Sequence, residues 1–357
     1  MSTTYWDYLR IHPLLSLQDG LGPHTPSPDE LHFIVVHQVF ELWFKLSLSQ
    51  LRLARDHLAT SHVPEEQIPF VVHHLRRVNE ILRVATEHFS VVETLAPQDF
   101  LSFRDSLIPA SGFQSFQMRE LELILGLGDD VRVRYGSVEA IPHLRDMASS
   151  SPTGKFVIEH LERALAEESL RSALHRWLAR TPIHGSTPAD PGDAARVDGF
   201  LHEYLHIAET WQRSSIDKLV SALGEAQRQA VTARVEASIA GLRRFLLPDD
   251  PALRRVHAGL LFIESYRDLP LLAWPRLLLE TVVALEEQLL IFRHRHARMA
   301  ERVIGRRVGT GGSAGVEYLD QTTAYRIFPE LWAVRAVLVP RDALPPVENG
   351  SMYGFAG

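Results

Sequence analysis

The clearest hydrophobic pattern in the chain lies between residues 275 and 305, where apolar side chains recur at steps of three, four and seven. Residues with this spacing share one stripe of an α-helix. The stripe contains Leu285, Leu289, Phe292, Met299 and Val303. His296 falls on the same stripe, whereas His294 lies about 200° away round the helix. The pattern therefore predicts a helix that directs the His296 imidazole towards the interior, where a buried polar group needs a partner or a ligand.

The same periodicity, with helix-capping signals, predicts helices over most of the remaining chain. Ser27 and Glu30 have capping-box spacing, and Pro28 stands at the first helical position. The predicted helices cover residues 28–60, 65–94, 113–125, 200–223 and 225–246, a short one begins at Pro97, and residues 130–180 have an amphipathic helical pattern. Residues 182–199 are rich in proline and glycine and predict a loop. Residues 332–339 are the best candidate for a strand. We expect an all-α chain that forms a single domain over residues 1–357, because no break in composition divides it.

Composition narrows the class of protein. The chain has 357 residues, of which 45% are hydrophobic, so it can bury a sizeable core. A net charge of −7 argues against a general nucleic-acid binder. The absence of cysteine excludes disulfides, thiolate metal sites and a cysteine nucleophile, and leaves 18 histidines as the abundant soft metal ligands. No signal peptide and no uncharged apolar run of ~18 residues is evident, so we expect a cytoplasmic protein that does not enter a membrane.

The N-terminal residues are unusually aromatic. Tyr5, Trp6, Tyr8 and Leu9 follow one another closely. Leaving such a segment in water is costly, so it either packs on its own chain or docks on a neighbouring subunit.

Three short motifs suggest chemistry that their context does not favour. His202, Glu203 and His206 match H-E-x-x-H, which on a helix would place two imidazoles beside a glutamate base, as in a zinc hydrolase. No third ligand follows at a recognised spacing. Residues 311–315 match G-x-S-x-G and residues 309–314 match G-x-G-x-x-A, but both motifs require a preceding strand. Here the predicted preceding element is a helix.

A more informative set consists of His37, Arg104 and His296, each on an apolar helix face, and the glycine-rich segment that contains Thr310. Taken alone, each histidine is most simply a satisfied core residue, and Arg104 is most simply ion-paired with Asp99 or Asp105. Together they favour another interpretation. An imidazole on a bundle helix is a natural axial ligand of haem iron, and an arginine in an apolar pocket suits capture of a carboxylate. The residues alone therefore predict a cofactor pocket in a helical bundle.

Long stretches of the chain resemble the tryptophan 2,3-dioxygenase family, haem enzymes that open the indole ring of tryptophan. The matching stretches are YLRIHPLLSLQ from Tyr8, ELHFIVVHQVFELWFK from Glu30, FRDSLIPASGFQSFQMRE from Phe103, and RVIGRRVGTGGSAGVEYL with FPELWAVR within residues 292–335. They cover about a third of the chain. The resemblance fades between about residues 130 and 270, where the chain looks longer than compact bacterial members.

On the cofactor side, the resemblance implies a helical domain that encloses a b-type haem. His296 resembles the proximal ligand of the iron. Phe89 stands beside the haem, where some members have tryptophan. Ser111 resembles a serine at the distal haem face.

On the substrate side, the resemblance implies that His37 contacts the indole N–H and Phe33 the indole ring. Arg104 resembles the clamp for the substrate carboxylate, and Thr310 the residue that meets the α-ammonium group. Phe100 stands near the carboxylate, where some members have tyrosine.

The resemblance also implies a homotetramer. Tyr5, Tyr8 and Leu9 resemble residues that reach into a neighbouring subunit's pocket.

The implied reaction inserts both atoms of O₂ across the indole C2–C3 bond of L-tryptophan, or a close derivative, to give N-formylkynurenine in tryptophan catabolism. One alternative is a related haem enzyme that inserts a single oxygen atom into a tryptophan derivative in a biosynthetic pathway. Others are a haem sensor without turnover and a zinc hydrolase that uses His202, Glu203 and His206.

Overall fold

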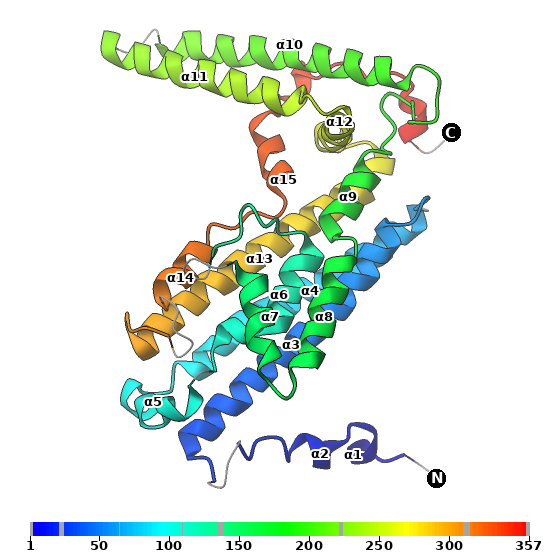
Figure 1. Ribbon diagram of the computed structural model, residues 1–357. Coiled ribbons are helices and arrows are strands. Elements are labelled where there is room, and N and C mark those ends of the chain that lie inside the picture. Colours follow the sequence, from blue (N-terminus) through cyan, green and yellow to red (C-terminus); the bar gives the residue numbers. More distant parts are fainter. Residues whose placement is uncertain are drawn as a thin grey trace. The chain divides into compact units, whose positions relative to one another are not determined.

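The structure is a computed structural model that describes residues 3–20, 25–63, 65–108, 110–134, 139–220, 224–309 and 315–354 (Figure 1). These residues form helices and no β-strand, in agreement with the predicted all-α class. The α-helices are α1 (Tyr5–Tyr8), α2 (Ile11–Leu14), α3 (Pro28–Leu58), α4 (Ile68–Val92), α5 (Pro97–Phe103), α6 (Phe116–Leu125), α7 (Ala140–Ser149), α8 (Gly154–Ala166), α9 (Leu170–Leu178), α10 (Asp193–Val220), α11 (Glu225–Leu246), α12 (Pro251–Ser265), α13 (Ala273–Ile304), α14 (Val316–Thr322) and α15 (Pro329–Ala333). Short 3-10 turns include η2 (Arg104–Leu107), η3 (Gly112–Gln114) and η5 (Val334–Ala336).

Local sequence signals explain several helix ends. The Ser27 hydroxyl accepts a hydrogen bond from the backbone N–H of Glu30 at 3.1 Å, as its capping-box spacing predicts. Gly126 ends α6 with a positive φ of 103°, a conformation that glycine adopts without strain. α10 begins at Asp193, seven residues before the predicted 200, because Gly192 closes the loop and helix-forming residues follow it.

The strand predicted over residues 332–339 is wrong. These residues continue α15 into the 3-10 turn η5. The apolar residues that are buried here are Leu331, Val334 and Val337, which are spaced by three. That spacing places them on one side of a helical turn, and it outweighs the short β-like alternation that suggested a strand.

The chain divides into two compact units. Unit 1 contains residues 1–51, 77–167 and 285–326, and unit 2 contains residues 52–76, 168–284 and 327–357. The single domain expected from the composition stays a prediction.

Unit 1 packs helices around aromatic side chains. The predicted stripe of α13 is buried, with Leu285, Leu289, Phe292, Met299 and Val303 all less than one-tenth exposed. α8 packs against α6 and α7. Phe113 and Tyr318 join the apolar residues of α7 and α8 in one cluster.

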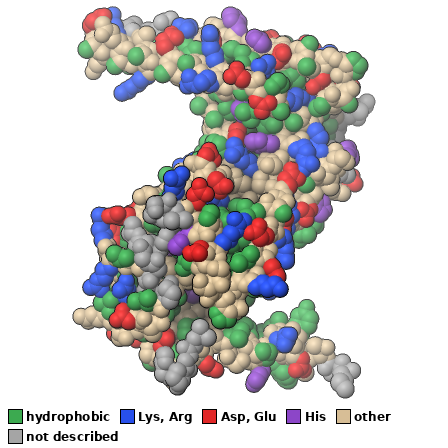
Figure 2. Space-filling model, viewed as in Figure 1, with side chains coloured by type: hydrophobic (Ala, Val, Ile, Leu, Met, Phe, Trp, Pro, Cys, Tyr) green, Lys and Arg blue, Asp and Glu red, His purple; other side chains and the backbone are tan. Residues whose placement is uncertain are grey.

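Unit 2 contains the hairpin of α10 and α11, which lie side by side and contact α12 (Figure 1). Both signs of charge cover the hairpin surface (Figure 2), where Arg213 pairs with Glu236 and Arg243 with Glu209. α9 packs closely on α12 at Gly259.

Within the part of the chain that the structure describes, one helix, α3, is long and apolar enough to cross a membrane by length and composition alone. Its apolar residues fall on two faces. Phe40 and Phe44 are buried and contact Phe292 of α13, with ring centroids 5.9 Å apart in each case. The other face of α3 carries exposed apolar side chains, such as those of Leu42 and Leu46. Packing of one face on other helices is typical of a core helix in a globular protein.

Candidate active site

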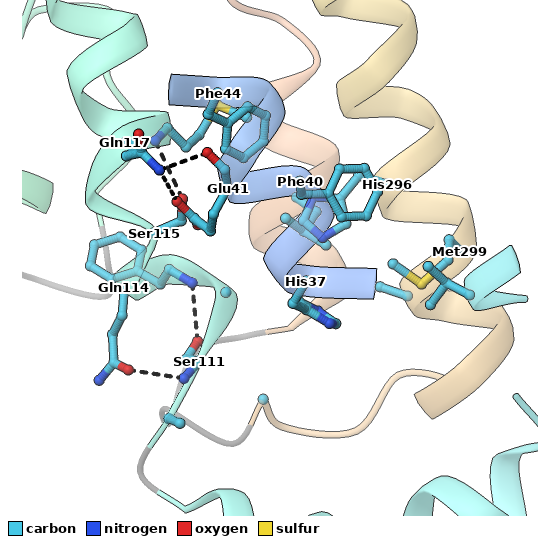
Figure 3. Close-up of a pocket in the computed structure, with 18 of the residues that line it drawn as sticks. His37, Phe40, Glu41, Phe44, Ser111, Gln114, Ser115, Gln117, His296 and Met299 are labelled. Atoms are coloured by element: carbon cyan, nitrogen blue, oxygen red, sulfur yellow. Dashed lines mark hydrogen bonds between the residues drawn. The ribbon is translucent and has the colours of Figure 1, made fainter. Parts of the chain in front are cut away.

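Unit 1 encloses a cavity of about 960 Å³, lined by residues of α3, α4, α5, α6, α13 and α14. Its walls are mainly apolar, and nine of the lining residues are phenylalanines. Seven of the predicted site residues line it: Phe33, His37, Phe89, Phe100, Arg104, Ser111 and His296. Figure 3 shows His37 on α3 and His296 on α13 at the same cavity. A large apolar cavity with few polar groups is the usual form of a cofactor or substrate site.

His296 lies on the cavity side of α13, whereas His294 is exposed, as the periodicity predicted. Its imidazole stacks on the ring of Phe89, with centroids 5.5 Å apart and 7° between the planes. Burial, reinforced by repulsion from His37 and Arg293, lowers the pKa of His296 to about 4. The ring is therefore neutral at pH 7, and one nitrogen keeps a lone pair that can bind a metal.

The residues around His296 fit a haem. No group of three histidine, aspartate or glutamate side chains that could hold a metal ion occurs among the described residues. A single imidazole ligand, such as that of His296, suits a metal whose other ligands come from a macrocycle. The surrounding walls are apolar, with Phe40, Phe44, Phe292 and Met299 among the lining residues. These walls match the largely apolar faces of a porphyrin.

His37 is fixed in one tautomer. Its Nδ1 lies 2.7 Å from the carbonyl oxygen of Phe33, one turn earlier in α3. A carbonyl oxygen can only accept, so Nδ1 carries the proton. Burial lowers the pKa of His37 and outweighs this hydrogen bond, which raises it. The neutral ring is therefore favoured. Nε2 is then a hydrogen-bond acceptor.

Arg104 connects the cavity to the segment that follows α13. Its Nη2 donates a hydrogen bond to the carbonyl oxygen of Val308 at 2.6 Å, rather than to Asp99 or Asp105. Its Nε is buried without a hydrogen-bond partner among the described residues. The guanidinium therefore keeps donor capacity for a ligand.

Ser111 is held in place by a local capping box. Its hydroxyl accepts from the backbone N–H of Phe113 at 3.3 Å, and its own N–H donates to the side chain of Gln114 at 3.2 Å. Nearby, Gln117 donates to the carboxylate of Glu41 at 2.7 Å, a pair that the sequence did not indicate (Figure 3).

Thr310 lies outside the described residues. Gly309 and Gly315, the nearest described residues before and after it, line the cavity. A Cβ atom at Gly315 would lie 2.6 Å from the carbonyl oxygen of Arg307, and φ there is +59°, so this position requires glycine.

The predicted N-terminal residues do not line the cavity of their own chain. Tyr5 is 72% exposed and Tyr8 is 79% exposed, and Leu9 is exposed as well. Hydrophobic side chains of this segment are visible at the bottom of Figure 2. Polar contacts tie the segment to α3, where Gln38 donates to the carbonyl oxygen of Leu17 at 2.8 Å.

A buried ionic cluster beside the cavity was missed at the sequence level. Arg119, Arg132 and Arg293 all contact the carboxylate of Glu122, and Arg119 donates a hydrogen bond to the hydroxyl oxygen of Tyr318. The three-residue spacing of Arg119 and Glu122 in α6 is the one sequence signal that points to it.

The H-E-x-x-H residues lie on α10 in unit 2. His202, Glu203 and His206 are exposed, and the Nδ1 of His202 contacts the backbone carbonyl of Asp198. The motif is thus a solvated helix face in this structure.

Comparison with known proteins identifies the family. Residues 1–338 match the family described as tryptophan 2,3-dioxygenase. Tryptophan 2,3-dioxygenase 2 of Ralstonia nicotianae is 45% identical, over 99% of this chain and 98% of its own length. Tryptophan 2,3-dioxygenase of Sorangium cellulosum is 45% identical, over 98% of this chain and 87% of its own. A tryptophan 2,3-dioxygenase-like protein of Xanthomonas campestris is 44% identical, over 73% of this chain and 98% of its own. The chain belongs to the tryptophan 2,3-dioxygenase family.

Proposed function

We propose that the chain is a haem-dependent dioxygenase that opens the indole ring of L-tryptophan, or a close derivative, with both atoms of O₂ to give N-formylkynurenine. The observation that carries this proposal is the cavity itself. Two neutral imidazoles, His37 and His296, line one apolar cavity from different helices, together with the guanidinium of Arg104. The full-length relatives named as tryptophan 2,3-dioxygenases support the same reaction.

For the cofactor, we assign His296 as the residue that holds the iron of haem b. Phe89 fixes the plane of this imidazole by stacking on it, and Ser111 contributes a polar group to the same cavity. When bound, the haem activates O₂ for transfer to the substrate. The apolar walls exclude water from the reacting atoms.

For the substrate, the groups of the cavity match the polar atoms of tryptophan. Arg104 binds the carboxylate, with its free Nε and the Nη2 that now contacts Val308. His37 accepts a hydrogen bond from the indole N–H at Nε2, and the rings of Phe33 and Phe100 pack on the indole. Thr310 is proposed to meet the α-ammonium group. The main contribution of these residues is to hold C2 and C3 in a reactive orientation.

For the assembly, we propose a homotetramer in which Tyr5, Tyr8 and Leu9 reach the pocket of a neighbouring subunit. Two exposed apolar surfaces support this. One is the N-terminal segment, and the other is a row on α3 that contains Leu31, Val35, Leu42 and Leu46. Exposed apolar surface of this extent is typical of an interaction site. Coverage of the row by another subunit explains why α3 is apolar on both faces, and fits a cytoplasmic protein.

The test is an absorption spectrum of the reduced protein with and without L-tryptophan under O₂. We expect a Soret band, a shift on adding tryptophan, and growth of the N-formylkynurenine absorbance. With ¹⁸O₂, the product should gain two labelled atoms. Incorporation of one atom identifies the mono-oxygenase alternative, and a Soret band without product identifies a sensor. Zinc without iron in the purified protein would support the hydrolase.

A further inference from the structure

We propose that Arg119 and Arg293 bind a propionate carboxylate of the haem, and so fix its orientation in the cavity. The inference rests on the proposed haem. It concerns the ionic cluster centred on Glu122, which has no role in the substrate site described above.

The cluster has more positive than negative charge. The Glu122 carboxylate lies 2.8 Å from Arg293, 2.6 Å from Arg132 and 3.1 Å from Arg119. Burial raises the pKa of Glu122, but the three guanidiniums outweigh it and hold the pKa below its usual value. Glu122 is therefore ionised, and its single charge is shared by three cations. Asp129 pairs with Arg132, so one further anion is needed to neutralise the cluster.

Arg132 already has other partners. Its Nε contacts the carboxylate of Asp129 at 3.3 Å, and its Nη2 donates to the carbonyl oxygen of Leu127 at 3.2 Å. Arg132 is also absent from the lining of the cavity. The uncompensated charge therefore lies on the other two arginines.

Arg119 and Arg293 line the cavity although they are only 6% and 5% exposed. The Nε of each is buried and has no hydrogen-bond partner among the described residues. Leaving buried charged donors unpaired is costly, and a carboxylate that accepts from them removes the cost.

The phenols beside the cluster cannot supply the missing charge. Tyr318 lies 3.4 Å from Arg119, and the guanidinium of Arg293 lies over the ring of Tyr325 at 4.5 Å. Burial raises the pKa of both hydroxyls, so both stay protonated and neutral at pH 7. The anion must come from a ligand in the cavity.

The chemistry of haem b supplies such an anion. Its macrocycle is apolar apart from the two propionates, and the cavity walls are largely apolar. His296 follows Arg293 by one turn on α13, so the iron ligand and the proposed carboxylate site belong to one rigid element. A guanidinium and a carboxylate form strong, directional hydrogen bonds.

The test compares iron protoporphyrin IX with its dimethyl ester, which lacks both negative charges. The full-length protein is loaded with each, and the rate of transfer to excess apomyoglobin is measured. We expect the wild type to hold the diacid about 10- to 100-fold longer than the diester, as one or two charge-assisted hydrogen bonds predict. In Arg119→Met and Arg293→Met this ratio should fall towards one.

Arg132→Met is the matched control. It removes the same charge from Glu122 but changes no cavity residue, so the ratio should stay at the wild-type value. If a methionine variant does not fold, Arg293→Lys tests the same contact, because it keeps the positive charge. The ratio of diacid to diester retention in Arg293→Lys should stay close to the wild-type value. Equal retention of diacid and diester by the wild type would overturn the proposal, as would an unchanged ratio in both methionine variants. A wild type that takes up neither compound contradicts the proposed haem function instead.

Discussion

The ring of Phe89 lies parallel to the imidazole of His296, with 5.5 Å between centroids and 7° between planes. Phe89 comes from α4 and His296 from α13, so two helices define the orientation of one imidazole. A metal ligand that is held before the metal arrives loses little conformational freedom on binding. This arrangement leads to the first prediction.

His296→Ala should lose haem, because no second imidazole on α13 faces the cavity. We expect the purified variant to lack a Soret band while its far-UV circular dichroism stays helical. His294→Ala is the control, since it removes an exposed imidazole two residues away. Haem loss in the His294 variant with retention in His296→Ala would show that the wrong histidine has been assigned.

Arg104→Ala should keep haem and mainly weaken substrate binding. Loss of charge-assisted hydrogen bonds to a carboxylate raises KM by about 10- to 100-fold. Steady-state kinetics with L-tryptophan and with tryptamine, which lacks the carboxylate, show whether the higher KM comes from the lost carboxylate contact. The wild type should prefer L-tryptophan strongly, and the variant should have lost this preference. A variant that still discriminates would place the carboxylate elsewhere.

The sequence predicted the residues that regular helices present, and missed those that depend on contacts between distant segments. His296 could be chosen over His294 because 3.6 residues per turn determines which side of a helix each occupies. The Glu122 cluster could not be found this way, because Arg293 is 171 residues from its partner. Residues 332–339 show a short β-like alternation, but the buried side chains of Leu331, Val334 and Val337 are spaced by three, as in a helical turn.

The hydrogen bond from His37 to Phe33 predicts a requirement for a free indole N–H. Nδ1 carries the proton, so Nε2 can accept from the substrate but cannot donate to it. 1-Methyl-L-tryptophan should therefore have a kcat/KM reduced at least about tenfold. In His37→Ala the penalty for the methyl group should shrink, whereas His32→Ala, on the same helix, should keep it. An equal penalty in all three proteins would assign the N–H contact to another residue.

The stability of the haem-free chain should fall as the pH is lowered from 6.5 to 4. The unfolded chain binds a proton at His296 near pH 6.5, whereas the folded chain does so only near pH 4. The unfolded state therefore binds more protons in this window, and His296 alone lowers the free energy of unfolding by on the order of 3 kcal/mol. Urea denaturation between pH 4 and 8 measures it. His296→Leu should make the profile shallower, while His37, whose pKa burial also lowers, keeps its own contribution. An unchanged slope would argue against a neutral, desolvated imidazole at His296.

Two glycine-to-alanine substitutions in unit 2 should have opposite effects on stability. A Cβ at Gly259 of α12 would lie 2.2 Å from the carbonyl oxygen of Leu178 in α9, so the helices must separate. Overpacking of this kind costs about 3 kcal/mol. At Gly241 of α11, the nearest atom is the Nη2 of Arg244 at 3.9 Å, and alanine should stabilise the helix by about 0.5–1 kcal/mol. Thermal denaturation of the haem-loaded protein should give a lower Tm for Gly259→Ala and a slightly higher one for Gly241→Ala. Equal Tm values for the two would mean that α9 and α12 do not approach as closely as Gly259 allows.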